Sequence, residues 1–177
     1  MTFRAARPDP AARLAEIKAH RHPVALLLDG LDDARNLGVI FRLAEAARLE
    51  HVYLHRLPAY HLSDGQLSKK IGKISREAVR YVPFTVLPDW ESTAALSEHY
   101  QPVALEWTER SIPYTEFVPG ERTLLVLGSE AYGMSDEVLA WTDAQIHLPM
   151  YGLNTSMNVA CAASIATYDL LRQLTAR

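Results

Sequence analysis

The sequence predicts an α/β protein whose mainly parallel sheet is covered by helices on both faces. Apolar runs of strand length stand at residues 24–28 and 123–127, and they alternate with segments whose apolar positions recur every three or four residues. Parallel strands need a crossover between them, and a helix is the usual crossover. The alternation therefore favours a parallel sheet with helices on its faces.

The first half of the chain alternates between helix and strand. Asn36 stands where a helix N-cap is expected, and Ser63 and Gln66 have the spacing of a capping box, which places a helix start near residue 64. Gly65 and Gly72 weaken that helix. The expected elements are a helix at residues 9–20, a buried strand at 24–28, a helix at 36–49, a strand at 51–54 and a helix from about residue 64.

The second half continues the alternation with shorter elements. Pro83 interrupts one possible strand, and Ser135 is the expected cap of a short helix. Residues 108–122 have the composition of a loop. The expected elements are a strand at residues 81–87, a helix at 89–100, strands at 103–107 and 123–127, a helix at 135–141, a strand at 146–148 and a final helix from about Ser156.

Length and composition fit one globular domain. The 177 residues are 49% hydrophobic and 22% charged, which is enough to bury a sizeable core. We expect a domain at residues 23–177, preceded by a short helical extension at residues 1–22. No apolar run is long enough to cross a membrane and the N-terminus does not resemble a secretory signal, so a cytoplasmic protein without membrane contact is expected. The single cysteine, Cys161, is expected to be a small core residue.

Whole-chain charge gives no support for nucleic-acid binding, because the net charge is −3 and the pI is about 6.2. The charge is uneven, however: residues 51–80 are rich in Lys and Arg, whereas residues 81–143 are rich in Asp and Glu. A solvated helix face is the ordinary interpretation of the basic run, and a surface for phosphate groups is the alternative. The basic side chains concerned are Lys69, Lys70, Lys73, Arg76 and Arg80.

Three short segments follow predicted strands, at the edge where an open parallel sheet binds its ligands. In residues 32–42, Asn36 and Arg42 lie six positions apart. A regular helix does not align them, so they meet only if Asn36 belongs to the preceding loop. Taken alone, these residues are typical of a helix cap and a surface arginine.

The other two segments are rich in residues that shape loops. In residues 127–135, Gly128 and Gly133 fit neither a phosphate-binding loop nor a dinucleotide fingerprint, and a strand-to-helix turn explains them as well as a ligand does. Residues 148–160 expose backbone groups and lead into a helix N-terminus, where Ser156 and Asn158 are competing caps or ligand contacts. The seven histidines do not cluster with the cysteine at ligand spacing, so no metal site is expected.

Together and in this order, the three segments resemble the motifs of SpoU-type RNA methyltransferases of the SPOUT superfamily. The matching stretches read NLGVIFR, LGSEAYGMS and LPMYGLNTSMNVACAASI, and they span residues 36–165. The resemblance implies S-adenosylmethionine as methyl donor, a C-terminal deep trefoil knot in the sheet, and a homodimer with its site near the subunit interface. It also implies methyl transfer to a ribose 2′-hydroxyl of RNA, and a compact enzyme suits transfer RNA better than ribosomal RNA.

The resemblance assigns roles to residues of all three motifs. It implies a catalytic set of Asn36, Arg42, Glu130, Ser156 and Asn158. The implied donor-binding residues are Leu127, Gly128, Glu130, Gly133, Ile146, Leu148, Met150, Ser156 and Met157. Many family members carry an added N-terminal RNA-binding domain or long basic extensions, whereas about 22 residues precede the first strand here, so RNA selection is expected from the domain surface. The expected RNA contacts are Lys69, Lys70, Lys73 and Arg76, with the Arg-bearing N-terminus as a second candidate.

The chemistry requires that the 2′-hydroxyl lose a proton while it attacks the methyl group in line. A guanidinium stays protonated and has no lone pair, so Arg42 is not expected to be the base. Our hypothesis is that Arg42 clamps the adjacent RNA phosphate, while the phosphate or water receives the proton. Asn36 and Asn158 would orient Arg42 and the ribose.

Three other interpretations compete with ribose methylation. One is a knotted methyltransferase that acts on an RNA base, against which the pair Asn36 and Arg42 argues. Another is an RNA-binding protein of the same fold without catalysis, which the presence of every motif residue disfavours. A dinucleotide-dependent oxidoreductase is excluded by the glycine spacing after Leu28.

Overall fold

A computed structural model describes residues 9–56 and 66–176, except for the side chains of residues 10, 11 and 66–70. Seven strands form one sheet in the order β3-β2-β1-β6-β4-β7-β5, and every neighbouring pair is parallel. The predicted parallel sheet is therefore confirmed. The strands are β1 (His22–Asp29), β2 (Leu49–His55), β3 (Phe84–Val86), β4 (Gln101–Leu105), β5 (Ile112–Pro113), β6 (Thr123–Gly128) and β7 (Ala144–His147).

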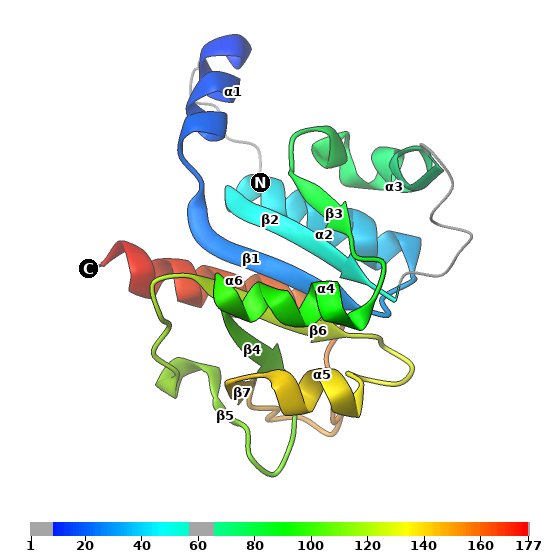
Figure 1. Cartoon of the computed structure of the whole chain (residues 1–177), viewed down its shortest axis with the longest axis vertical. Helices are drawn as coiled ribbons and strands as arrows, with labels where there is room; N and C mark the ends of the chain where they lie inside the picture. The colour runs from blue at the N-terminus through cyan, green and yellow to red at the C-terminus, as the bar shows by residue number, and fades with distance from the viewer. Residues whose placement is uncertain (1–8, 57–65, 177) are drawn as a thin grey trace.

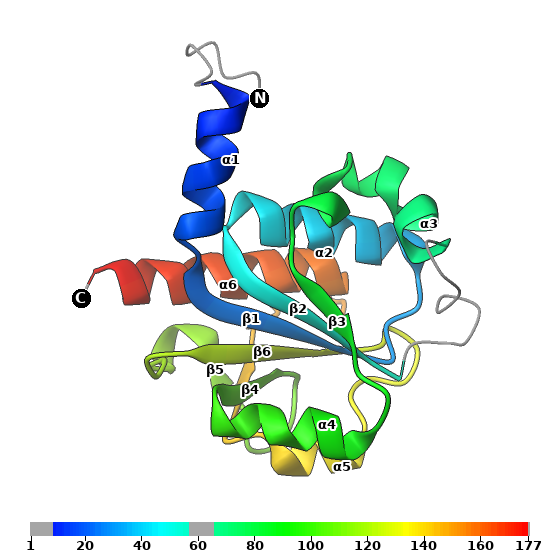
Figure 2. The ribbon, with the colours of Figure 1, turned by 45° about the horizontal axis from the view of Figure 1, so that its top comes forward.

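Helices cover both faces of the sheet, as the sequence predicts (Figures 1 and 2). On one face lie α2 (Ala34–Ala46) and α6 (Val159–Thr175), and α3 (Gln66–Ser75) packs against α2. On the other face lie α4 (Trp90–Ala94) and α5 (Asp136–Trp141). The first helix, α1 (Pro10–Ala19), projects from the body in both views. In the described part of the chain no helix is long and apolar enough to cross a membrane.

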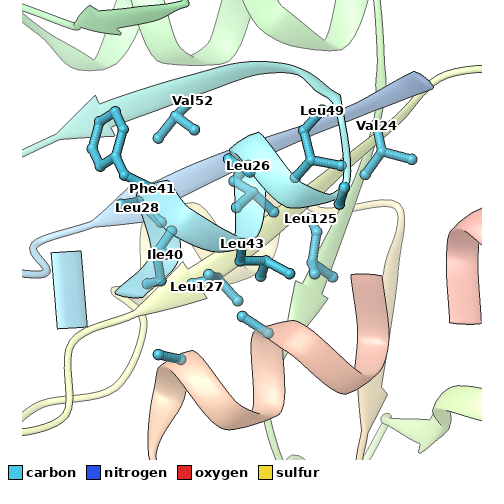
Figure 3. Close-up of a cluster of buried hydrophobic side chains, with 14 of the residues drawn as sticks. Val24, Leu26, Leu28, Ile40, Phe41, Leu43, Leu49, Val52, Leu125 and Leu127 are labelled. Atoms are coloured by element: carbon cyan, nitrogen blue, oxygen red, sulfur yellow. The ribbon is translucent and has the colours of Figure 1, made fainter. Parts of the chain in front are cut away.

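The core lies in two layers, one on each face of the sheet. Alternate residues of a strand point to opposite faces, so β1 sends Leu26 and Leu28 toward α2 and α6, and Ala25 and Leu27 toward α4 and α5. The larger layer brings Phe41 of α2 onto the strands (Figure 3). These strands are buried on both faces, and for that reason they appear in the sequence as continuous apolar runs.

Two helix starts differ from the sequence-based expectation. The N-cap of α2 is Asp33, whose carboxylate accepts from the backbone N–H of Arg35 at 2.7 Å and of Asn36 at 3.3 Å. Asn36 is therefore inside the helix and not its cap. At α6 the cap is Asn158, whose Oδ1 accepts from the N–H of Ala160 at 3.0 Å, so the helix begins after the expected Ser156.

Several boundaries also differ. The predicted helix at 89–100 is divided into α4 and a 3₁₀ turn, Ala95–Glu98, and the predicted loop contains the short strand β5 and the turn Tyr114–Glu116. The strand predicted at 103–107 ends at Leu105, and the strand predicted at 146–148 ends at His147. The expected strand at 81–87 is reduced to β3. Ser63, of the predicted capping box, lies outside the described residues.

The prediction for Cys161 is wrong, because its side chain is exposed. Ala160, Ala163 and Ala166 form the face of α6 that packs on the sheet. Cys161 follows Ala160 by one residue, which turns it about 100° away from that face.

Candidate functional site

The loops that follow β1, β4, β6 and β7 meet at one edge of the sheet, because all four strands are parallel. A cavity of about 480 Å³, here called the central cavity, lies among three of these loops and the start of α6. That volume is within the range of small-molecule sites. It brings together six residues predicted from the sequence: Gly128, Glu130, Gly133, Ser156, Met157 and Asn158.

A tight backbone fold shapes the β6 side of the central cavity. The N–H of Ser129 donates to the carbonyl of Gly133 at 3.0 Å, and the N–H of Gly133 donates back to Ser129 at 2.9 Å. A Cβ at Gly128 would lie 2.4 Å from the carbonyl carbon of Gly133, and Gly133 itself has a φ of +67°. Both glycines are therefore required by the fold of the loop, which displays Glu130 and Tyr132 at its tip.

Asp29, at the end of β1, anchors the far side of this loop. Its buried carboxylate accepts from the backbone N–H of Ser135 at 3.0 Å, and from Nε and Nη2 of Arg56 at 2.7 and 3.0 Å. The Nδ1 of His55 lies 3.0 Å from the same carboxylate. Burial raises the pKa of Asp29, but the bonds from His55, Ser135 and Arg56 outweigh it and lower the pKa to about 2.

A smaller cavity of about 130 Å³, the side cavity, adjoins the central one and shares Leu105, Glu106, Ser156, Met157 and Ala162 with it. Two further predicted residues, Leu148 and Met150, line the side cavity. Leu127 and Ile146, by contrast, have their side chains buried in the sheet. Only their backbone groups are available to a ligand at this edge.

The second large space at the same edge, here called the asparagine cavity, has a volume of about 540 Å³. Asn158 Nδ2 donates to Asn36 Oδ1 at 2.9 Å, which joins the first and third motifs across 122 positions of sequence. Ser129, Glu130 and Asn158 line both the asparagine cavity and the central cavity. Ligands in the two cavities would therefore lie next to each other.

Arg42 is placed apart from the rest of the predicted catalytic set. It lines a separate cavity of about 590 Å³, the arginine cavity, together with Arg76, Ser164 and Tyr168. Since Asn36 is inside α2, the six-residue spacing turns Arg42 to another side of the helix, as the helical geometry requires. Within one chain the structure does not bring Arg42 to Asn36.

The predicted basic surface is described only in part. Lys73 at the end of α3 and Arg76 just after it are exposed, and Arg76 reaches the arginine cavity. Lys69 and Lys70 are in α3, but their side chains lie outside the described residues.

Sequence reasoning missed several residues at this edge. Glu106 and Trp107 line the side cavity, because β4 ends at Leu105, whereas the sequence placed both in a strand. Trp107 packs on His147 with ring centroids 4.2 Å apart. Tyr132 is 92% exposed beside the asparagine cavity. A polar residue directly after an apolar strand run was the available signal for Asp29 and Glu106.

Among the described residues, no three His, Cys, Asp or Glu side chains are grouped to hold a metal ion.

The protein is of the α/β class, and its cavities lie at the carboxyl edge of a parallel sheet, the edge where open sheets of this class bind ligands. Residues 23–168 match the model of the SpoU rRNA Methylase family. The chain belongs to this family, as the resemblance of its motifs predicted.

Individual relatives show the same relationship. A protein of Staphylococcus saprophyticus assigned to the TrmH family of tRNA/rRNA methyltransferases is 31% identical over 149 residues, which are 84% of this chain and 58% of that protein. The SpoU methyltransferase AviRb from Streptomyces viridochromogenes, solved in complex with the cofactor AdoMet, matches with a TM-score of 0.77 and 21% identity over 93% of this chain and 65% of that chain.

A third relative is closer in length. It was solved for the 2-OH methylation of C/U34 on tRNA, and it matches with a TM-score of 0.72 and 26% identity over 87% of this chain and 97% of that chain. The present chain spans about 58% of the length of the first curated relatives that it matches.

Proposed function

We propose that the protein transfers a methyl group from S-adenosylmethionine to a ribose 2′-hydroxyl of RNA. The observation that carries the proposal is the meeting of two cavities at Glu130 and Asn158. Methyl transfer needs two substrates held side by side and in line, and adjacent cavities with shared walls provide that arrangement. Membership of the SpoU family supports the reaction type.

The donor would occupy the central and side cavities. The glycines at 128 and 133 keep side chains away from this space, and their loop exposes backbone groups for hydrogen bonds to the donor. Leu148, Met150 and Met157 provide the apolar wall that an adenine ring needs. The donor supplies an electrophilic methyl group on a sulfonium, and the AviRb complex with AdoMet supports this assignment.

The acceptor ribose would occupy the asparagine cavity. Asn158 uses its Oδ1 to cap α6 and its Nδ2 to hold Asn36, so its position is fixed from both sides. The Nδ2 of Asn36 donates to no group among the described residues, which leaves it free to donate to a ribose oxygen. Glu130 lines both the asparagine and the central cavity, so it stands at the boundary between acceptor and donor, and Ser156 lines the donor side of that boundary. Both would orient the two substrates.

Arg42 would complete the site from a second copy of the chain in a homodimer. The surface around the arginine cavity carries three exposed apolar side chains. They are Val39 of α2, Tyr168 of α6 and Tyr81, which lies between α3 and β3. Covering this surface would remove it from water and carry Arg42 of the partner subunit toward the acceptor. There the guanidinium would clamp the phosphate beside the reacting ribose.

RNA would be held by exposed side chains on the surface of the domain. Tyr132 and Tyr151 are 92% and 96% exposed, and flat rings of this kind stack on unpaired bases. Lys73 and Arg76 would contact phosphate groups. We propose transfer RNA as the substrate, supported by the structure of similar length that was solved for insight into the 2-OH methylation of C/U34 on tRNA. The proposal includes the C-terminal trefoil knot, with the segment before α6 threaded through a preceding loop.

The test is transfer of labelled methyl from S-adenosylmethionine to unmodified transfer RNA and, separately, to ribosomal RNA. Digestion by alkali then locates the label, because a 2′-O-methyl group protects the following phosphodiester bond. We expect label in alkali-resistant dinucleotides from transfer RNA. Label in free mononucleotides would show methylation of a base, and donor binding without transfer to either RNA would contradict catalysis by this chain alone.

A further inference from the structure

Glu106 stands in the proposed donor site although none of the three sequence motifs contains it. It is the first residue after β4, and it lines both the central and the side cavity. Its Oε1 accepts from the backbone N–H of Trp107 at 3.0 Å. Its Oε2 lies 3.2 Å from the point where a Cβ on Gly133 would stand, so the carboxylate faces the glycine loop.

The charges that line the donor site have one sign. Glu106 and Glu130 both line the central cavity, whereas among the residues that the structure describes no Lys or Arg lines the central or the side cavity. His147, the other titratable side chain there, is held by Ser111 at 2.8 Å and covered by Trp107. Glu106 forms no ion pair within the described part of the chain. The field in the two cavities is therefore negative.

The two forms of the proposed cofactor differ in charge. S-adenosylmethionine has a sulfonium, an ammonium and a carboxylate, so its net charge is +1. When the methyl group moves to the ribose oxygen, the C–S bond breaks and its electron pair stays on sulfur, which becomes a neutral thioether. The hydroxyl proton leaves to the phosphate or to water. The product S-adenosylhomocysteine therefore has no net charge.

We infer that Glu106 makes the site select the charged donor over the neutral product. This inference rests on the proposed function, because it assumes that S-adenosylmethionine is the ligand. A half-buried carboxylate attracts the cationic donor and gains nothing comparable from the neutral thioether. The methyl transfer itself thus removes part of the binding energy, which favours release of the product and limits inhibition by it.

The experiment measures the dissociation constants of S-adenosylmethionine and S-adenosylhomocysteine by calorimetry, for the wild type and for Glu106→Gln. Glutamine keeps the shape and an acceptor for the Trp107 N–H but removes the charge. We expect the dissociation constant of the donor to rise about tenfold and that of the product to change less than about twofold. Glu109→Gln is the matched control, because Glu109 is exposed three positions further on and lines neither cavity.

Two results would overturn the inference. Equal weakening of donor and product would mean that the carboxylate holds a group common to both, such as the ribose diol. No weakening of either would mean that its charge does not act on the ligand. As a second measurement that needs no variant, the preference of the wild type for donor over product should decrease as salt is added. A preference that does not respond to salt would also contradict the inference.

Methyl transfer by the same wild-type preparation separates this inference from the proposed function. If the wild type transfers methyl groups and Glu106→Gln leaves the preference intact, only the selection by charge is wrong. If the wild type neither binds the donor nor transfers methyl groups, the proposed function fails, and the inference fails with it.

Discussion

Asp29 shows how one buried residue holds the ligand edge of the sheet in place. Its carboxylate joins the end of β1 to Arg56 after β2 and to Ser135 after β6, so three loops share one anchor. A buried carboxylate is costly unless donors surround it, and here five hydrogen bonds from three side chains and one backbone group do so. The lowered pKa of Asp29 is the measurable sign of this arrangement.

Asp29→Asn should lower the free energy of unfolding at neutral pH by about 3 kcal/mol, since it leaves Arg56 without its counter-ion. The folded pKa, about 2, is below that of an unfolded Asp, so the ionised carboxylate stabilises the fold above about pH 4 and this contribution is lost as the pH falls toward 2. Urea unfolding across that range should show a smaller pH dependence for the variant. Part of the pH dependence remains in the variant, because the pKa of Asp33 is also lowered to about 2. An equal pH dependence in both proteins would contradict the role of Asp29.

Arg42→Lys tests the role given to the guanidinium. If Arg42 clamps a phosphate with two parallel hydrogen bonds, lysine keeps the charge but loses the fork. We expect kcat for RNA methylation to fall roughly 100-fold while the dissociation constant of the donor is unchanged. Near-full activity would show that charge alone is sufficient.

At the scale of elements, the glycine loop after β6 determines the shape of the proposed donor site. Gly128→Ala would place a methyl group 2.4 Å from the backbone of Gly133 and Met134, so the loop must move. We expect donor affinity to fall at least about tenfold and stability by about 2 kcal/mol. Gly152→Ala is the control, because a Cβ there meets nothing within 4 Å, and its effect should stay below about 0.5 kcal/mol. Equal donor affinity in the two variants would refute this role for the loop.

The sequence predicted the presence of helices and strands more accurately than the residues at which they begin and end. Apolar runs and helical spacing located every strand from β1 to β7 except β5, whose two residues carry too little periodicity to detect. Ends were misplaced where a residue other than the expected one caps the helix, as with Asp33 in place of Asn36. They were also misplaced where apolar residues continue past the last ladder bond, as with Trp107 after β4.

At the scale of the whole molecule, the sequence indicated residues that gather at the carboxyl edge of the sheet, but not how they divide among the cavities. The motifs identified Gly128, Glu130, Ser156 and Asn158, which the fold brings to one cavity. Arg42 is separated from them because its side chain points away from Asn36 on α2. The spacing of the two residues predicts this direction only when the residue at which the helix starts is known. Glu106 was missed because its place depends on the register of β4 with β7.

The proposed dimer makes a prediction for mixed subunits. Arg42→Ala and Asn36→Ala should each inactivate the homodimer. A purified heterodimer of the two should recover roughly half of the wild-type activity, because one of its two sites then combines an intact Asn36 with an intact Arg42 from the other subunit. Activity is measured after tandem purification through two different tags. No recovery would show that Arg42 acts within its own chain, and an active Arg42→Ala homodimer would show that Arg42 has no part in the reaction.

The most direct test of the central claim removes one oxygen atom, that of the 2′-hydroxyl, from the substrate. Once the methylated nucleotide is located, the same RNA is prepared with a 2′-deoxyribose at that position only, and labelled methyl transfer to both RNAs is compared. If the ribose hydroxyl is the acceptor, the deoxy RNA should bind to the protein but accept no methyl group. Undiminished transfer to the deoxy RNA would show that the acceptor is a base and would contradict the proposed reaction.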